Sequence, residues 1–590
     1  MSAASHENAA EDKTPVFPSP FTFILNNPVP LVEMRLRRFS GEIRDKPRWW
    51  EKVYDAEIVS RWTREIIEHD RAMVEQFWGG GKRYEEGSGE KQWPRDPITE
   101  AQLRYLFDEL RYLANHRDEE TGISKTTIPM VYESTALIPA ALKCALLSLT
   151  EQLEDIPEEE KDWHPGSNNQ VLDLIHPSLF CLRLGRSFVY DPQPGHTDPL
   201  RQLTLDQYFS RRPDIGRRTE DVWQRRHGDS LLLFDYTVSK AYQWLPTDFA
   251  VSDDGQVRPK GYINNLHPER HSAAYETISS ALKWFIPLFE RVISDQLSPP
   301  PPPIFPIEPQ MWYDHPEAQW PEDMDHGPEL EEWERVHHWP LIPDAVPFQP
   351  PDADERATLR LKGRTIQVIV KMANIVLTPD NPTYPGGSWH VEGMANEKVV
   401  ATGIYYYGSE NITESKLMFR AAVGDGQSMG ATFLEYEQWD HRGYLTVYGI
   451  TNDMALNQQL GHITATEDKC IAFPNIYQHR VAPFELADRS RPGHRKILAF
   501  FLVDPLTPVH STSTVPPQQA DWYRDVVCGS SAFRKLPAEL VEMILRYVLE
   551  STITTEEAMA DRLELMEERA QFVTTHNADL FEAQFAMCEH

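Results

Sequence analysis

The sequence predicts an α+β protein, with helical regions at both ends and a strand-rich section at residues 355–510. Three observations support this prediction. Apolar residues recur with helical spacing across much of residues 21–298, and again at 520–590. Runs of β-branched and aromatic residues dominate the section between them. A proline-rich segment at residues 299–354 separates the first helical region from the strands.

The N-terminal region begins with a segment, residues 1–20, that we predict to be disordered because it is polar and then rich in proline. Residues 21–298 are predicted to be mostly helical. Helical periodicity is clearest over four stretches, residues 46–78, 98–115, 134–153 and 271–296, whereas residues 170–270 have a mixed character. The whole chain, at 590 residues, is long enough for a large core and for more than one domain.

The proline-rich segment at residues 299–354 opens with the run Pro299 to Pro303. Such a composition is typical of extended, polyproline-like chain. Several tryptophans are interspersed, so we expect the segment to wrap over a folded surface rather than to act as a free linker; they are Trp312, Trp320, Trp333 and Trp339. A proline-rich ligand for a signalling module is the alternative.

The core at residues 355–510 is predicted to consist of strands and turns. The stretches 364–376, 398–407, 415–423 and 443–450 all have the composition that strands prefer. A further apolar run follows Arg495, at residues 496–503. The C-terminal region, residues 520–590, is predicted to be helical, with one helix opening at Pro537 and a charged one over 554–573.

The composition excludes several classes of function. Lys and Arg number 58 against 90 Asp and Glu, for a net charge of −32 over 590 residues. Such a negative surface field argues against a nucleic-acid-binding face and against binding to anionic membranes. The five cysteines form no C-x-x-C pair, and we find neither a signal peptide nor a run of about 18 apolar residues. We therefore expect an intracellular protein, cytoplasmic or nuclear, with no membrane partner.

The most informative motif is Ser388-Trp389-His390-Val391-Glu392-Gly393, read together with the downstream segment 478–481. Residues i and i+2 of a strand point to the same face, so His390 and Glu392 can offer an imidazole and a carboxylate to one ion. His479 supplies a second imidazole. Two His and one carboxylate form the facial triad that holds non-haem Fe(II). The alternative is a hydrogen-bonded core histidine, with Glu392 capping a local turn.

Arg495 stands at the start of the apolar run that follows His479. A guanidinium there could make a bidentate pair with a dicarboxylate cosubstrate. Arg489 and Arg491 also lie between His479 and this run, in a segment that is predicted to be a turn. We prefer Arg495 because it enters the predicted strand directly, although either of the other two arginines could take its role.

The order H-x-E, a long gap, His, then a basic residue on the next strand resembles the Fe(II)/2-oxoglutarate-dependent oxygenase superfamily. The resemblance implies a double-stranded β-helix, or jelly-roll, core between the helical regions. It also implies that His390, Glu392 and His479 bind iron and that Arg495 binds the far carboxylate of 2-oxoglutarate. Most members of the superfamily have Asp where this chain has Glu392, and Glu is a known variant.

A second resemblance extends over nearly the whole chain, from about residue 20 to about residue 575. The chain resembles a large, mostly fungal family of conserved proteins of unknown function. The matching segments are 162–167, 172–179, 262–268, 387–393, 473–479 and 491–495. This resemblance implies that nearly the whole chain belongs to one family, but it identifies no substrate.

Other polar residues are weaker candidates. His164, His176 and His267 could line a substrate pocket or a second metal site, with Asp173 nearby, although His-Pro pairs often bond locally. Residues 405–407, all tyrosines, and Arg420 lie on predicted strands, where packing is the simpler role. Asn396 and Glu397 follow the H-x-E motif and would contact substrate or lie in a solvated loop.

Together these features predict an enzyme that uses Fe(II), 2-oxoglutarate and O2 to hydroxylate, desaturate or demethylate an unidentified substrate. The residues expected to carry the chemistry are His390, Glu392 and His479, with Arg495 for the cosubstrate. Two alternatives remain open. One is a cupin-type metal-dependent dioxygenase or isomerase, although cupins usually have an H-x-H pair. The other is a non-catalytic adaptor that retains the jelly roll.

Overall fold

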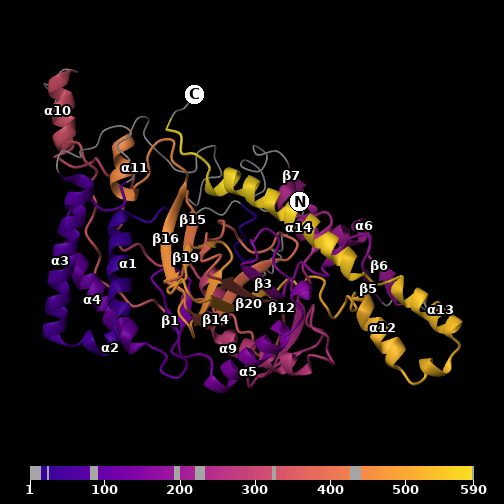
Figure 1. The fold of residues 1–590 in the computed structure, drawn as a ribbon. Helices are drawn as coiled ribbons and strands as arrows, with labels where there is room; N and C mark the ends of the chain where they lie inside the picture. The colour runs from indigo at the N-terminus through magenta and orange to yellow at the C-terminus, as the bar shows by residue number, and fades with distance from the viewer. Residues whose placement is uncertain are drawn as a thin grey trace, which may run out of the picture.

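The computed structural model describes residues 15–22, 26–79, 91–191, 199–219, 233–319, 321, 327–424 and 440–587. It shows a mixed α and β architecture in which a large antiparallel sheet lies between a layer of N-terminal helices and a group of C-terminal helices (Figure 1). Residues 1–14 of the predicted disordered segment lie outside the described residues, as do Trp320 and Cys588.

The N-terminal helices pack around a shared apolar core on one side of the sheet (Figure 1). They are α1 (Leu31–Arg44), α2 (Trp49–Lys52), α3 (Ala56–Trp78) and α4 (Glu100–Asn115). The single helix predicted over 46–78 is in fact two, because the side chain of Asp55 accepts hydrogen bonds from the amides of Glu57 and Ile58 and starts α3 afresh. The predicted helix 134–153 begins later, as α5 (Ala140–Glu154), after Pro139.

Nine strands of the described chain form the large sheet, in the order β1-β2-β17-β14-β20-β12-β10-β11, with β3 also pairing β12. All of these pairs are antiparallel. The long central strands confirm three of the predicted stretches: β12 (Thr365–Leu377), β14 (Val399–Glu410) and β20 (Gly493–Val503). Their neighbours are β1 (Ser124–Lys125), β2 (Tyr132–Ser134), β3 (Val171–Ile175), β10 (Thr247–Val251), β11 (Val257–Pro259) and β17 (Cys470–Pro474).

Helix α9 (Ser272–Leu297) covers one face of this sheet, together with α5 (Figure 1). Its buried side chains include Ile278, Leu282, Phe285 and Phe289. The approach is so close that a Cβ atom built on Gly403 of β14 would lie 2.6 Å from the Phe285 ring. Glycine at this position therefore allows the helix to pack against the sheet, and the opposite face of the sheet is left for the site described below.

A second, smaller sheet faces the large one. Its order is β16-β15-β18, formed by β16 (Asn457–Thr464), β15 (Lys416–Ala422) and β18 (Gln478–Val481). A cluster of apolar side chains fills the space between the two sheets, with Ile369, Ile404, Ala499 and Phe501 from the large sheet and Leu417 and Phe419 from the small one. Strand β15 confirms the stretch predicted at 415–423.

The strand predicted at residues 443–450 is wrong: this stretch forms helix α11 (His441–Tyr448). Asp440 caps its start by accepting a hydrogen bond from the Gly443 amide, and Gly449, at φ 71°, ends it in the left-handed conformation. The apolar face of α11 packs against Trp312, whose ring centroid lies 5.1 Å from that of Tyr444. This contact brings the proline-rich segment onto the folded body.

The remaining elements are short strands, small helices and the C-terminal helices. Two-stranded pairs join β4 (Leu182–Arg183) to β9 (Tyr242–Gln243), β5 (Phe188–Tyr190) to β6 (Leu200–Gln202), β7 (Arg218–Thr219) to β8 (Leu233–Phe234), and β13 (Thr383–Tyr384) to β19 (Phe484–Glu485). The helices are α6 (Leu205–Ser210), α7 (Pro213–Gly216), α10 (Pro328–His337), α12 (Ala520–Gly529), α13 (Ala538–Leu549) and α14 (Thr555–His576). Among the described residues, no helix has the length and apolar character needed to span a bilayer.

Candidate metal centre

His390 and His479 are brought together by main-chain pairing at the edge of the small sheet. The two residues form an isolated antiparallel bridge, in which each amide donates to the other residue's carbonyl, at 3.2 and 3.0 Å. His479 also lies opposite Phe419 of β15, so the pairing extends the small sheet by one segment. Residues far apart in the sequence therefore present their imidazoles side by side, with ring centroids 4.4 Å apart.

Glu392 completes the group. Its Oε1 atom lies 3.8 Å from Nε2 of His390 and 3.3 Å from Nε2 of His479. One ligand atom from each of the three residues lies within 4.8 Å of the others. The structure thus brings together the three side chains that the sequence singled out. Two imidazole nitrogens and a carboxylate oxygen converging on one point are a donor set suited to a divalent first-row metal.

The Ser388 carbonyl fixes the ring of His390. Nδ1 of His390 lies 2.9 Å from this oxygen, which can only accept a hydrogen bond. The proton of a neutral His390 therefore sits on Nδ1, and the Nε2 lone pair is left pointing toward Glu392. A carbonyl partner on the far ring nitrogen is the usual arrangement for a histidine that binds a metal through the other nitrogen.

The electrostatics of the three groups are dominated by burial and by their mutual charges. Burial opposes ionisation of Glu392, but the adjacent imidazoles of His390 and His479 outweigh it and hold the pKa of Glu392 well below its usual range. Burial would also lower the pKa of His390, and the neighbouring Glu392 carboxylate raises it instead. For His479, burial and the neighbouring His390 lower the pKa. The site therefore contains an ionised carboxylate and one imidazole that favours its neutral form.

Asn475 anchors Glu392 through the main chain. Its side chain accepts a hydrogen bond from the Glu392 amide at 2.8 Å and donates to the Glu392 carbonyl at 2.9 Å and to the Val399 carbonyl at 3.1 Å. Asn475 is only 1% exposed. The sequence marked this residue as part of a matching segment, but its clamping role depends on a contact between distant segments that no local pattern reveals.

The turn after Glu392 is locked in place by buried polar groups. Gly393 adopts φ 71°, which favours glycine. Asn396 and Glu397, which we considered as substrate contacts or as part of a solvated loop, are fully buried. Glu397 accepts from the amides of Met394 and Trp244, and Asn396 accepts from Ser239. Their hydrogen bonds are committed to the protein, so they hold the turn rather than face solvent.

Arg495 lies on β20 with its side chain buried, at 1% exposure. One nitrogen, Nη1, donates to Ser415, while Nε and Nη2 have no hydrogen-bond partner. The guanidinium stacks near the rings of Tyr406 and Phe484, at 5.3 and 5.0 Å from their centroids. Burial lowers the pKa of Arg495, and no carboxylate of the described chain forms an ion pair with it. A buried cation left in this state is costly unless an anion joins it.

The two other arginines that the sequence left open have different surroundings. Arg489 pairs with Glu485 and Arg491 pairs with Asp488, and both side chains are mostly exposed. Val481, two residues beyond His479 on β18, packs into the cluster of Ile375, Phe484 and Ile497 that lies around Arg495. Arg495 and the strand that carries His479 therefore share one apolar cluster, whereas Arg489 and Arg491 pair with carboxylates at the surface.

A second group of possible ligands, His164, Asp173 and His176, also lies within 4.8 Å. Here Asp173 is already engaged: its Oδ2 lies 2.7 Å from Nδ1 of His164 and accepts a hydrogen bond from Arg562 of α14. Burial opposes the shift, but the bond from His164 and nearby positive charges lower the pKa of Asp173 to about 2. The guanidinium already supplies the positive charge that a metal ion would bring, so this cluster ties α14 to the N-terminal half.

The remaining sequence candidates have structural partners. His267 accepts hydrogen bonds from the amides that follow it. Arg420 binds Gln478 and Glu582 on the outer side of the small sheet. Tyr405 and Tyr407 pack on the α9 side of the large sheet, whereas Tyr406 faces the inner side, near Arg495. Of the three tyrosines, Tyr406 is therefore the one that lies beside Arg495.

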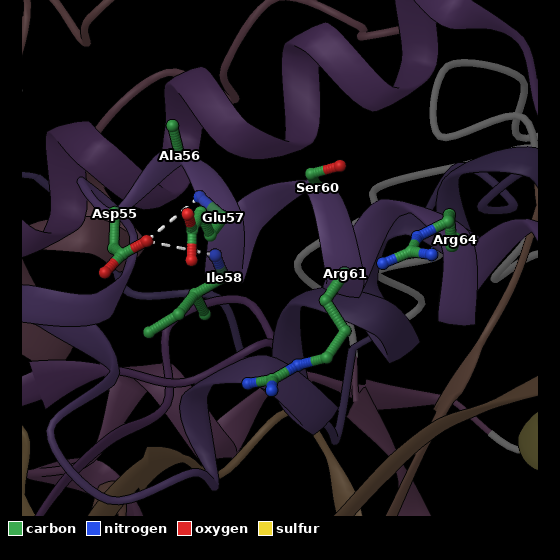
Figure 2. A pocket seen from close by; sticks show the side chains of 7 residues that line it. All are labelled: Asp55, Ala56, Glu57, Ile58, Ser60, Arg61 and Arg64. Atoms are coloured by element: carbon green, nitrogen blue, oxygen red, sulfur yellow. Dashed lines mark hydrogen bonds between the residues drawn. The ribbon is translucent and has the colours of Figure 1, made fainter.

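A surface depression at the start of α3 is shown in Figure 2 and is lined by Asp55, Ala56, Glu57, Ile58, Ser60, Arg61 and Arg64. The carboxylate of Asp55 is occupied by the helix amides of Glu57 and Ile58. The depression lies on the N-terminal helical layer and includes none of the residues of the metal-binding group. It has no convergent set of catalytic side chains.

The fold and this site define a mixed α and β protein with a candidate metal centre between two antiparallel sheets. The family described as "Protein of unknown function (DUF4246)" matches residues 100–526, and the "Domain of unknown function DUF4246, N-terminal" matches residues 2–65. The chain therefore belongs to the DUF4246 family. No curated protein matches the sequence.

Three solved structures show weak similarity. IDO from Bacillus thuringiensis has a TM-score of 0.15 at 9% identity, over 24% of this chain and 46% of that chain. The Fe(II)/(alpha)ketoglutarate-dependent dioxygenase TqaL has a TM-score of 0.20 at 11% identity, over 64% and 93%. A bsmA homolog from Methylobium petroleophilum PM1 has a TM-score of 0.22 at 10% identity, over 62% and 86%. Similarities of this size support no conclusion about activity.

Proposed function

We propose that this protein is an Fe(II)/2-oxoglutarate-dependent oxygenase. His390, Glu392 and His479 would hold the iron, and Arg495 would bind the far carboxylate of 2-oxoglutarate. The observation that carries the proposal is the convergence of two imidazole Nε2 atoms on one carboxylate oxygen, at 3.8 and 3.3 Å. This set has the composition of a two-His, one-carboxylate facial triad, which leaves coordination positions open for a cosubstrate and O2.

The order of the strands supports a double-stranded β-helix around the site. After β12 in the large sheet, the chain reaches His390 beside the small sheet, returns to the large sheet as β14, and then forms β15 and β16 in the small sheet. It returns again as β17, crosses to β18, and ends in the large sheet as β20. Such repeated crossing between two facing antiparallel sheets is expected of a jelly roll.

The donor set of the three residues suits iron. Glu392 is held ionised, and the hydrogen bond to Ser388 frees Nε2 of His390 as a donor. Bound iron with 2-oxoglutarate and O2 would supply the oxidation of a substrate C–H bond, with 2-oxoglutarate converted to succinate and CO2. Hydroxylation is the simplest outcome, and desaturation or demethylation would need the same protein groups.

Arg495 supports the choice of cosubstrate. Two of its guanidinium nitrogens, Nε and Nη2, are buried without partners, which is a geometry that a carboxylate could satisfy with a bidentate pair. Ser415 and the rings of Tyr406 and Phe484 would hold the guanidinium in place before the ligand arrives. A cupin-type enzyme has no dicarboxylate cosubstrate, so it would have no ligand to pair with a buried arginine at this position.

The other residues of the chain would position these groups and keep water away. Asn475 would hold the main chain of Glu392, and the His390–His479 pairing would fix the separation of the imidazoles. The Phe473 ring lies 4.9 Å from that of His479 and gives the site an apolar wall. A wall of this kind strengthens the electrostatic interactions of the site.

The proposal is tested by reconstituting the protein with Fe(II) without oxygen, then adding 2-oxoglutarate and air and measuring succinate. We expect slow succinate formation even without a primary substrate, and none in Glu392→Gln. Iron binding without succinate formation would favour the cupin-type alternative. The absence of stoichiometric iron binding would favour a non-catalytic protein.

A further inference from the structure

Trp389 lies on the outer face of the small sheet, directly behind the candidate metal ligands. Because His390 and His479 form an antiparallel bridge, the residues next to them, Trp389 and Arg480, also stand opposite each other. Successive side chains of an extended chain point to opposite faces, so the two imidazoles share the inner face and Trp389 and Arg480 share the outer one. The guanidinium carbon of Arg480 lies 4.6 Å from the centroid of the Trp389 ring.

A second guanidinium contacts the same ring. Arg420 of β15 places its guanidinium carbon 4.9 Å from the ring centroid of Trp389. Its Nε donates to the side chain of Gln478, the residue before His479, at 2.7 Å, and its Nη2 pairs with Glu582 at 2.9 Å. Arg420 is therefore fixed from two sides, and Trp389 rests against a rigid group of the small sheet.

The contact with Trp389 is the interaction that the structure shows for the guanidinium of Arg480. Within the part of the chain that the structure describes, no carboxylate pairs with Arg480, and its Nε is buried without a hydrogen-bond partner. A guanidinium is weakly hydrated and stacks well on aromatic faces. Two such cations near one ring repel each other, and the negative face of the indole offsets this repulsion.

His390 is the metal ligand that depends most on such support. Its side chain is 35% exposed, against 5% for His479. Residues 385–389, which lead to His390, form no regular strand; besides the two bonds of the bridge, the Gly387 amide donates to the Val481 carbonyl at 2.9 Å. A segment held by few main-chain bonds at the edge of a sheet opens readily, and its movement would carry the His390 imidazole away from Glu392.

We propose that Trp389 is a positioning residue, whose contacts with Arg420 and Arg480 hold the His390 imidazole at the separation from His479 that a metal ion requires. This inference rests on the proposed function, because it takes the three side chains to be metal ligands. It gives the outer face of the small sheet a role in metal binding, although none of the ligands lies there.

The test uses the full chain and Co(II), which occupies sites of this donor type and whose visible absorption bands report the number and arrangement of its ligands. Trp389→Leu removes the ring and keeps an apolar side chain, Trp389→Phe keeps an aromatic face, and Arg480→Met removes the cation. The matched control is Trp339→Leu. Trp339 belongs to the proline-rich segment and is contacted by two arginines, Arg95 and Arg442, at 4.6 and 4.9 Å from its ring centroid.

We expect Trp389→Leu to weaken Co(II) binding about 10–100-fold, as the loss of a group that supports a metal ligand does, and to change the absorption bands. Arg480→Met should change both in the same direction and to a smaller extent. Trp389→Phe should retain most of the affinity and the parent spectrum, because the ring face remains. Trp339→Leu should match the parent in both measurements.

Parent-like Co(II) affinity and spectrum in Trp389→Leu would overturn the proposal. So would a Trp389→Phe variant as weak as Trp389→Leu, because the aromatic face would then not be what holds His390. If Trp389→Leu does not fold, Arg480→Met decides, and a parent-like affinity and spectrum in that variant overturn the proposal. A parent protein that binds no Co(II) would instead contradict the proposed function.

Thermal unfolding of the metal-free proteins separates positioning from stability. Trp389→Leu and Trp339→Leu should both lower Tm, since each removes a ring that two guanidiniums contact. Only Trp389→Leu should also lose Co(II) affinity. If Trp339→Leu loses as much Co(II) affinity as Trp389→Leu, the loss follows from reduced stability, and Trp389 has no positioning role.

Discussion

The main chains of His390 and His479 bond to each other in both directions, with N–O distances of 3.2 and 3.0 Å. The two residues are therefore held side by side by their main chains, and the Ser388 carbonyl then fixes the ring of His390. Such a site can lose a side chain without losing its shape. This property allows metal binding to be tested separately from folding.

Replacing His390 or His479 by alanine should abolish stoichiometric iron binding and leave the fold largely intact, because each change removes one of three ligands while the main-chain pairing remains. Metal analysis after anaerobic reconstitution, with circular dichroism as the check on folding, measures both. His462→Ala, which changes an exposed histidine of β16, is the matched control. Parent-like iron content in either variant would show that the triad is wrongly assigned.

Iron affinity should depend more on the charge of the Glu392 side chain than on its length. Glu392→Asp shortens the side chain by one methylene but keeps the carboxylate, so we expect weaker yet measurable iron binding. Glu392→Gln removes the charge that both histidines face and should lose more affinity. Competition against a metal-binding dye gives the two dissociation constants. Unaltered affinity in both variants would place Glu392 outside the coordination sphere.

Arg495→Ala should weaken 2-oxoglutarate binding by roughly a hundredfold or more, at about 1.4 kcal/mol per tenfold, because the dicarboxylate would lose its buried partner. Iron content should be unchanged. Anaerobic calorimetry with the Fe(II) protein measures the binding. Arg489→Ala and Arg491→Ala are the controls, because each removes an arginine side chain that lies on the surface. If one of these reduces the affinity and Arg495→Ala does not, the cosubstrate role belongs to that other arginine.

Asn475→Ala should lower both stability and iron affinity. The change leaves the amide and carbonyl of Glu392 without partners in a buried place, at a cost of about 1–3 kcal/mol. Loss of such supporting contacts typically weakens metal binding by about 10–100-fold. Denaturant unfolding and metal titration are the measurements. A variant with reduced stability but parent-like iron affinity would show that Asn475 serves the fold alone.

His576 should make the protein sensitive to acid. Burial lowers its pKa to about 3, among the rings of Phe21, Phe572 and Phe581. A histidine whose pKa is lower in the folded than in the unfolded protein stays neutral in the native state. The free energy of unfolding is therefore unaffected by this group above about pH 6.5. It falls by up to about 5 kcal/mol as the pH drops toward 3. His576→Phe should flatten this part of the stability curve. If the free energy of unfolding of His576→Phe falls with pH as it does in the parent protein, His576 is not the group responsible.

The sequence predicted the central strands well because their signal is local. Strands β12 and β14 are rich in β-branched and aromatic residues, which pack well on a pleated surface. The same signal failed at residues 443–450. A short apolar run does not distinguish a strand from a helix, and the deciding features were the cap at Asp440 and the left-handed Gly449.

For the candidate site, the sequence predicted which residue types belong together but not what surrounds them. His390, Glu392 and His479 share one cluster, as their spacing suggested. The clamp from Asn475, the unpaired burial of Arg495 and the engagement of Asp173 by Arg562 all arise from contacts between distant segments. Such contacts depend on the register of the sheets, which no local pattern of residues encodes.

The most direct test of the central claim is a titration of 2-oxoglutarate into the Fe(II) protein without oxygen, followed by visible absorption. The proposed site predicts a weak metal-to-ligand charge-transfer band that saturates at one equivalent of 2-oxoglutarate, is absent in Glu392→Gln, and needs far more ligand in Arg495→Ala. An iron-loaded parent protein that develops no such band would contradict the oxygenase function.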